Sequence, residues 1–272
     1  VSRCLGVAVT SGNTYTAAMA LRGIRTAARL LGIQLDQATA AIIGATGDIG
    51  SACARVLSRE VRVLNLAARN EVRLENFASS LQAEAKCSIR ITKYTADAIR
   101  SADVILTATS SLTTLIRPED VQPGAVICDV AIPHNVAADL LQYRNDVLAF
   151  EGGLARLPSR LIERTDKSIY LSRDGITVFG CLAEVMTLAL EGRLESYSLG
   201  RGHITPERID EIESIASRHG FELADFCYAG KRFTNEEIKQ IRLNALHASR
   251  GGSTSYARTS ADTAASRGRG GT

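Results

Sequence analysis

The segment Gly44-Ala45-Thr46-Gly47-Asp48-Ile49-Gly50 decides the fold. It follows the apolar run Ala38–Ile43, which reads as a short strand, and opens into the helical stretch Asp48–Ser58. In a turn of this spacing the first glycine permits the tight bend, the second lets the backbone approach a pyrophosphate, and the third lets the helix pack closely on the strand. The first N–H groups of the helix and the positive end of its dipole then face the phosphates.

This segment therefore predicts a dinucleotide-binding turn, and the alternative is a glycine-rich turn without a ligand. The residues that we expect to contact the cofactor here are Gly44, Thr46, Gly47, Asp48, Ile49, Gly50 and Ser51.

The end of the next apolar run, Val61–Ala67, indicates which dinucleotide binds. A domain that takes NAD places an acidic residue about 20 residues after the turn, where it holds the ribose 2′-hydroxyl. This chain has Arg69-Asn70 there instead. A planar guanidinium pairs bidentately with phosphate oxygens, so Arg69, with Asn70 beside it, predicts recognition of a 2′-phosphate and hence NADP. A surface arginine at the end of a strand is the other interpretation.

Short apolar runs alternate with helical stretches on both sides of this segment. Runs that are apolar on both faces and alternate with helices predict a parallel sheet covered on both sides. The expected class is α/β, a Rossmann-type doubly wound parallel sheet with flanking helices and a C-terminal helical segment. The expected strands are Ala38–Ile43, Val61–Ala67, Ile89–Tyr94, Asp103–Ala108, Ala125–Val130 and Val147–Phe150; the expected helices are Tyr15–Leu31, Asp48–Ser58, Glu71–Glu84, Thr95–Ser101, Cys181–Glu191 and a last one from Thr205 to His219.

The same pattern predicts four parts of the chain. Residues 1–37 hold a connecting helix that Asn13 or Thr14 caps, and residues 38–168 form the NADP-binding domain. Residues 169–248 form a C-terminal helical and catalytic segment. Residues 249–272 contain almost no large apolar side chains, which predicts a disordered tail.

Composition excludes several functions. The net charge is only +3 and aromatic residues make up 5% of the chain, so no nucleic-acid partner is expected. The chain contains no run of 18 apolar residues, so no membrane-spanning helix is predicted. The six cysteines form no CxxC pair, which argues against a metal site and fits a reducing, cytoplasmic location.

Two further residues are candidates for a role in the reaction. Cys181 follows Gly180 at the start of an apolar helix, where the positive end of the helix dipole favours a thiolate. A thiolate suits covalent thioester chemistry, although from the residues alone a packed cysteine on an apolar helix is the better explanation of the position. His134 follows a predicted strand end, where α/β folds bind ligands, so it is a candidate for orienting substrate or nicotinamide, with a solvated loop histidine as the alternative.

Several segments together resemble the cyanobacterial long-chain acyl-acyl-carrier-protein reductases, enzymes that form fatty aldehydes. The segments are Thr10-Ser11-Gly12-Asn13-Thr14-Tyr15-Thr16-Ala17-Ala18, the glycine turn through Ser51, Ala68-Arg69-Asn70, Gly180-Cys181-Leu182-Ala183-Glu184 with Leu190-Glu191-Gly192, and Ser198-Leu199-Gly200-Arg201-Gly202-His203-Ile204-Thr205 with His219-Gly220-Phe221. The resemblance covers roughly residues 7–225. It implies that Cys181 takes the acyl group from acyl-carrier protein or acyl-CoA, that NADPH reduces the acyl-enzyme, and that an aldehyde-consuming enzyme is a partner.

Two departures from that family qualify the resemblance. The family's proteins are longer at the front, so the resemblance implies that this chain lacks most of a substrate-side unit, of which residues 1–37 hold the remnant. The family is also expected to carry lysine or another residue at position 134. Two other hypotheses therefore stand beside the reductase: an NADP-dependent dehydrogenase of the shikimate dehydrogenase or glutamyl-tRNA reductase kind, and a truncated NADP-binding module without catalysis.

Overall fold

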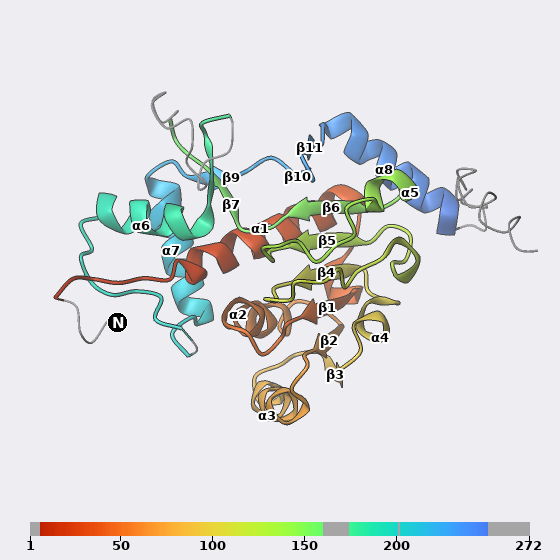
Figure 1. Cartoon of the computed structure of the whole chain (residues 1–272), viewed down its shortest axis with the longest axis horizontal. Helices are drawn as coiled ribbons and strands as arrows, with labels where there is room; N and C mark the ends of the chain where they lie inside the picture. Colours follow the sequence, from red (N-terminus) through yellow and green to blue (C-terminus); the bar gives the residue numbers. More distant parts are fainter. Residues whose placement is uncertain (1–5, 160–173, 201, 250–272) are drawn as a thin grey trace, which may run out of the picture.

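The computed structural model describes residues 6–159, 174–200 and 202–249. Its centre is a six-stranded, all-parallel sheet in the order β3-β2-β1-β4-β5-β6 (Figure 1). This is the strand order of the doubly wound nucleotide-binding fold, so the predicted Rossmann-type class is confirmed. The strands are β1 (Thr39–Ile43), β2 (Val63–Ala67), β3 (Ser88–Thr92), β4 (Val104–Thr107), β5 (Val126–Asp129) and β6 (Leu148–Glu151).

The burial of these strands explains why their sequences are apolar on both faces. Every residue of β1, β2, β4 and β5 is buried, whereas the edge strand β3 alternates between half-buried and exposed residues. Central parallel strands lie between two layers of helices and cannot alternate apolar with polar side chains. The weaker signal of the β3 segment thus reflects its place at the edge.

The helices flank the sheet and extend beyond it on one side (Figure 1). None in the described part is long and apolar enough to cross a membrane. The helices are α1 (Asn13–Leu31), α2 (Asp48–Leu57), α3 (Glu71–Gln82), α4 (Thr95–Ile99), α5 (Leu140–Tyr143), α6 (Gly180–Leu190), α7 (Pro206–Arg218) and α8 (Asn235–Ser249), with short 3-10 turns at Leu35–Gln37 and Pro118–Asp120.

The predicted cap of α1 is wrong. The helix begins at Asn13, and its N-cap is Gly12 in the left-handed conformation with φ 74°. Side chains from far along the chain satisfy its first amides instead: the Tyr15 amide donates to Glu184 Oε2 at 2.8 Å, and the Thr14 amide donates to Ser198 Oγ at 3.2 Å. Local sequence could not show this, since the acceptors lie about 170 to 180 residues away.

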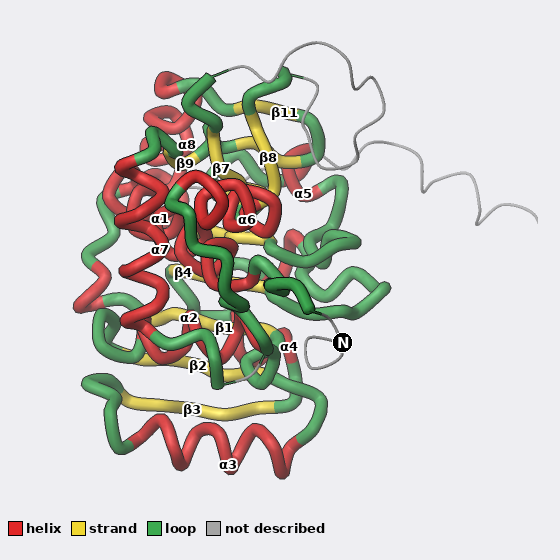
Figure 2. Tube along the Cα trace, turned by 90° about the vertical axis from the view of Figure 1, so that its left-hand side faces the viewer, coloured by secondary structure: helices red, strands yellow, loops and turns green. Residues whose placement is uncertain are grey.

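After the parallel sheet the chain forms short strands in addition to helices. A three-stranded antiparallel sheet joins β7 (Leu154–Arg156) to β8 (Thr177–Phe179) and β9 (Glu222–Leu223), and a small hairpin joins β10 (Cys227–Tyr228) to β11 (Lys231–Arg232). Figure 2 shows β7 and β8 beside α6. Helix α8 was not expected. Its last residue, Ser249, is helical, whereas the sequence predicts that the disordered tail begins there. Residues 250–272, the rest of the predicted tail, lie outside the described part.

Helix α1 packs on the central sheet, although the sequence-based division gave it to a separate first unit. A Cβ at its Gly23 would lie 2.7 Å from the Phe150 ring of β6, so the missing side chain permits this contact. The four predicted parts of the chain remain a prediction.

Candidate functional site

The main cleft lies at the carboxyl ends of the parallel strands, where the strand order reverses between β1 and β4. It encloses about 730 Å³. Ligands of doubly wound folds bind at this switch point. The lining residues are Asn13, Ile43, Gly44, Thr46, Gly47, Asp48, Ile49, Ala67, Ala68, Arg69, Asn70, Arg73, Lys93, Thr95, Ala108, Thr109, Ser110, Ser111, Leu115, Val130, Ala131 and Ile132.

The glycine turn adopts a conformation that only small residues allow. Gly44 has φ 84°, and a Cβ there would lie 2.5 Å from the Ala108 carbonyl oxygen. A Cβ at Gly50 would lie 2.3 Å from the Gly44 carbonyl oxygen, so α2 packs directly on the turn. The Gly47 amide donates to the Gly44 carbonyl at 2.9 Å. The turn thus leaves backbone rather than side chains at the mouth of α2, which fits a pyrophosphate.

Cationic side chains gather at the end of the cleft beside β2. Arg69 and Asn70 follow β2 directly and are exposed, and the Asn70 side chain accepts a hydrogen bond from the Arg73 amide at 2.9 Å. Arg73 reaches the Thr46 carbonyl at 3.4 Å, and Lys93 pairs with Glu71 at 3.0 Å. The sequence analysis did not name Arg73 or Lys93. The recurrence of arginine four residues after Arg69, one helical turn on, is the signal that could have found Arg73.

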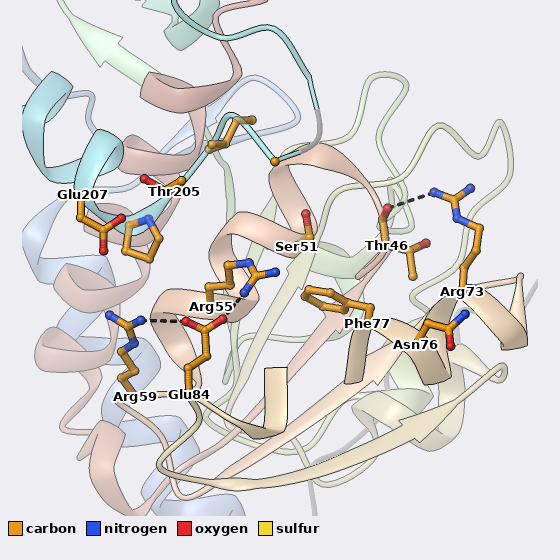
Figure 3. Close-up of a pocket in the computed structure, with 13 residues that line it drawn as sticks. Thr46, Ser51, Arg55, Arg59, Arg73, Asn76, Phe77, Glu84, Thr205 and Glu207 are labelled. Atoms are coloured by element: carbon orange, nitrogen blue, oxygen red, sulfur yellow. Dashed lines mark hydrogen bonds and ion pairs between the residues drawn. The ribbon is translucent and has the colours of Figure 1, made fainter. Parts of the chain in front are cut away.

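A second pocket, of about 550 Å³, lies on the outer side of α2 and shares Thr46 and Arg73 with the main cleft (Figure 3). Arg55 and Arg59 point into it, and both pair with Glu84. Because two acidic residues, Glu84 and Glu207, line this pocket and one, Asp48, lines the main cleft, this pocket is less suited to an anion.

Cys181 is the second residue of α6 and packs against backbone. A Cβ at Gly12 would lie 2.1 Å from Cys181 Cα, and a Cβ at Gly180 would lie 2.8 Å from Thr16 Cα. A Cβ at Gly153 would lie 2.6 Å from the Thr16 methyl carbon. Three glycines therefore let the start of α1, the start of α6 and the β6–β7 turn approach one another. The half-buried Cys181 lies at this junction.

A buried carboxylate holds the junction together. Glu184, one helical turn after Cys181, is fully buried. It accepts hydrogen bonds from the Tyr15 amide and from Ser198 Oγ, each at 2.8 Å, and from the Thr10 hydroxyl. Ser198 Oγ and Thr14 Oγ1 lie 2.5 Å apart. Three of the segments that carry the family resemblance, those that contain Thr10, Glu184 and Ser198, thus meet in one polar network. Arg201, in the third of these segments, lies outside the described residues.

The junction adjoins the cleft. Asn13 lines the cleft and adjoins Gly12, which touches Cys181. From the other side, a Cβ at Gly153 would lie 3.6 Å from Val130 Cγ1, and Val130 lines the cleft as well. The segment after Ser198 returns to the glycine turn, since a Cβ at Gly200 would lie 3.7 Å from Asp48 Oδ2. Cys181 is therefore positioned next to the cleft wall.

His134 lies beyond β5, between two carboxylates. Its Nδ1 is 3.4 Å from the buried Asp129, its Nε2 is 3.7 Å from Glu151, and its ring contacts Tyr228 with centroids 5.4 Å apart. The hydrogen bond to Asp129 raises the pKa of His134 above its usual 6.5. Asp129 also accepts hydrogen bonds from the backbone amides of Ala131, Asn135 and Val136. Asp129 therefore holds the loop that forms one wall of the cleft, and His134 contributes to this through its contact with Asp129. The sequence pointed to His134 but not to Asp129.

Comparison with known proteins agrees with this geometry. Residues 25–149 match the shikimate/quinate 5-dehydrogenase family. A long-chain acyl-[acyl-carrier-protein] reductase of Synechococcus elongatus is 35% identical over 216 residues, which is 78% of this chain and 61% of the relative. The aminotransferase PigE of a Serratia species is 30% identical over 243 residues, 87% of this chain and 27% of the relative.

Among solved structures, the shikimate 5-dehydrogenase of Listeria monocytogenes is similar with a TM-score of 0.37 and 12% identity, over 82% of this chain and 62% of that one. The chain spans about three fifths of the length of the acyl-[acyl-carrier-protein] reductase and about a quarter of the length of PigE. It contains an NAD(P)-binding, reductase-type domain related to shikimate dehydrogenases and acyl-carrier-protein reductases. The assignment of a nicotinamide dinucleotide as cofactor is thereby confirmed.

Proposed function

We propose that this chain carries the reductase half-site of an enzyme that reduces a long-chain fatty acyl thioester to a fatty aldehyde with NADPH. The observation that carries the proposal is the position of Cys181: a half-buried thiol at the start of α6, on a junction that adjoins the nucleotide cleft. The 35% identity to the acyl-[acyl-carrier-protein] reductase supports the thioester substrate.

The residues of the cleft fit the cofactor. Backbone at the glycine turn suits the pyrophosphate, and Arg69 with Asn70, assisted by Arg73, suits a 2′-phosphate, which favours NADP over NAD. When bound, the nicotinamide supplies the hydride. The protein's own part is to hold the pyrophosphate at α2, leaving the other end of the cleft, lined by Val130 and Ala131, for the reacting groups.

The Cys181 thiolate then attacks the thioester carbonyl carbon, and the carrier leaves as its own thiol after taking up a proton. Hydride addition to the acyl-enzyme carbonyl breaks the carbon–sulfur bond, releases the aldehyde and restores the Cys181 thiolate. The first amides of α6 stabilise negative charge that develops near the sulfur, because a helix N-terminus favours anions. In this proposal acyl-carrier protein or acyl-CoA is the substrate, an aldehyde-consuming enzyme is a partner, and the site of action is the cytoplasm.

The family match favours a second candidate, an NADP-dependent dehydrogenase of the shikimate dehydrogenase or glutamyl-tRNA reductase kind. Such an enzyme gives no reason for the three glycines that bring α1 against Cys181. A cofactor-binding module without turnover is the third.

The test mixes the protein with palmitoyl thioesters of acyl-carrier protein and CoA and with NADPH, and measures aldehyde by mass spectrometry. Aldehyde from the native protein, and at least about a thousandfold less from Cys181→Ala, is the expected result. NADPH binding without aldehyde from either thioester would leave the binding module as the better description. Turnover of shikimate or quinate would favour the second candidate.

A further inference from the structure

Helix α6 differs from an ordinary surface helix because it exposes apolar side chains and buries two polar ones. A surface helix buries its apolar side chains and exposes its polar ones. In α6 the buried positions include Glu184 and Thr187, both with no exposed surface. The exposed and half-buried positions are all apolar or small: Cys181, Leu182, Val185, Met186, Ala189 and Leu190.

These six residues form one face, which we call the α6 outer face. At 100° per residue they cover about half of the helix circumference, with Cys181, Val185 and Ala189 in a row along it. Val185 is 47% exposed and Leu190 is 57% exposed. Helix α6 lies at the margin of the molecule in Figure 1, and its other face packs on α1 and α7. An apolar surface of this kind marks a binding site.

The head of this face is the proposed nucleophile, Cys181, and an acyl chain attached there needs an apolar surface outside the space that the cofactor occupies. The Gly12 backbone closes one side. Asn13 and the nucleotide cleft, which the proposed function gives to the cofactor and the reacting carbonyl, lie beyond it. Among the described residues around Cys181, the apolar surface that starts at the thiol is the row through Val185 and Ala189. Ten residues of helix from Cys181 to Leu190 extend about 14 Å, long enough to follow much of a fatty acyl chain.

We infer that the α6 outer face binds the alkyl chain of the thioester and thereby makes the enzyme select long chains. The inference rests on the proposed function and adds to it the surface that reads chain length. Each methylene buried against such a face favours association about fourfold, so the preference for a long chain grows with the number of methylenes in contact. A short acyl group reaches Cys181 without touching Val185 or Ala189.

The experiment measures the rate at which butyryl-CoA and palmitoyl-CoA acylate Cys181, by intact-protein mass spectrometry without NADPH. The native protein is compared with Val185→Asp and with Leu243→Asp, a matched control on α8 where the leucine is 56% exposed. The expected result is that Val185→Asp lowers the palmitoyl-to-butyryl rate ratio at least about tenfold while the butyryl rate holds. Leu243→Asp should leave the ratio unchanged. Ala189→Asp, also at an exposed position, gives a second variant if Val185→Asp does not fold.

An unchanged ratio in folded Val185→Asp and Ala189→Asp overturns the inference and leaves the proposed function intact. An equal fall for both thioesters shows that the substitution acts on Cys181 itself and not on the alkyl chain, and a change of oligomeric state in the variants shows that a second copy covers the face; either result overturns the inference. If neither thioester acylates Cys181 in the native protein, the proposed function itself fails, and this inference with it.

Discussion

The glycine turn of residues 44–50 and the junction around Cys181 both depend on glycine, but they are built differently. In the turn, glycines a few residues apart shape one continuous stretch of chain, so the carbonyl of Gly44 meets Gly50. At the junction, Gly12, Gly153 and Gly180 come from three distant segments and let separate elements touch. The first motif can be found in a short stretch of sequence, and the second exists only in the folded chain.

This difference separates binding from chemistry. The turn recurs in many nucleotide-binding folds and identifies only the class of cofactor. The junction places a thiol beside the cleft and fixes it with the buried Glu184, so it carries what is specific to this chain. Substitutions at the junction should therefore alter folding and reaction together, whereas those in the cleft should alter cofactor binding alone.

The largest effect is expected for Gly12→Ala. The new Cβ would lie 2.1 Å from Cys181 Cα, and the backbone keeps φ 74°, so both a clash and strain arise. We expect a loss of about 3–5 kcal/mol in the free energy of unfolding, measured in urea. Gly192→Ala is the matched control: its φ is 71°, but a Cβ there meets no described atom within 4 Å, so about 1–2 kcal/mol is expected from strain alone. Equal losses would contradict the close packing at the junction.

Glu184→Ala should have the next largest effect. It leaves the Tyr15 amide and the hydroxyls of Ser198 and Thr10 without their acceptor, at a cost of about 3 kcal/mol in unfolding free energy. Glu184→Gln should cost only about 1 kcal/mol, because the amide oxygen can still accept from Tyr15 and hydroxyls can accept from the amide nitrogen. Thermal unfolding of the two variants checks the order, and a neutral Glu184→Ala would show that the carboxylate is not what joins α6 to α1.

Arg69→Ala should act on the cofactor and leave folding unchanged. Loss of a charged hydrogen bond to the 2′-phosphate should weaken NADPH binding about 10–100-fold and leave NADH binding as it is. Titration of both dinucleotides by calorimetry measures this. The control is Arg100→Ala, whose side chain is 72% exposed and lies outside the cleft lining. A parallel loss for NADPH and NADH would mean that Arg69 does not recognise the 2′-phosphate.

The smallest effect concerns His134. Its pKa is raised in the folded chain by Asp129, so protonated His134 adds stability that is fully present below its usual pKa of 6.5 and is lost as the pH rises through the raised value. The native protein should therefore lose some stability as the pH rises above about 6.5. In His134→Gln this part of the pH dependence should vanish, as followed by melting temperature between pH 6 and pH 9. If His134→Gln and the native protein show the same dependence of melting temperature on pH, His134 does not contribute to the pH dependence of stability.

The sequence predicts the sheet well because its signals are local. The apolar runs of β1, β2, β4 and β5 record burial on both faces, and the turn before α2 records the close approach of backbone. It predicts the start of α1 poorly, since the acceptors are Glu184 and Ser198 and no pattern near Asn13 encodes them. It also gives no sign that the exposed side of α6 is the apolar one, because an apolar helix looks alike whichever face is buried.

The most direct test of the central claim is peptide mapping by mass spectrometry after incubation with palmitoyl-CoA in the absence of NADPH. If Cys181 is the nucleophile, a palmitoyl adduct forms on it, and this adduct disappears when NADPH is added and aldehyde is released. An adduct on another cysteine, such as the half-buried Cys227, or no adduct while NADPH still binds, would contradict the claim that the thiol at the start of α6 is the nucleophile.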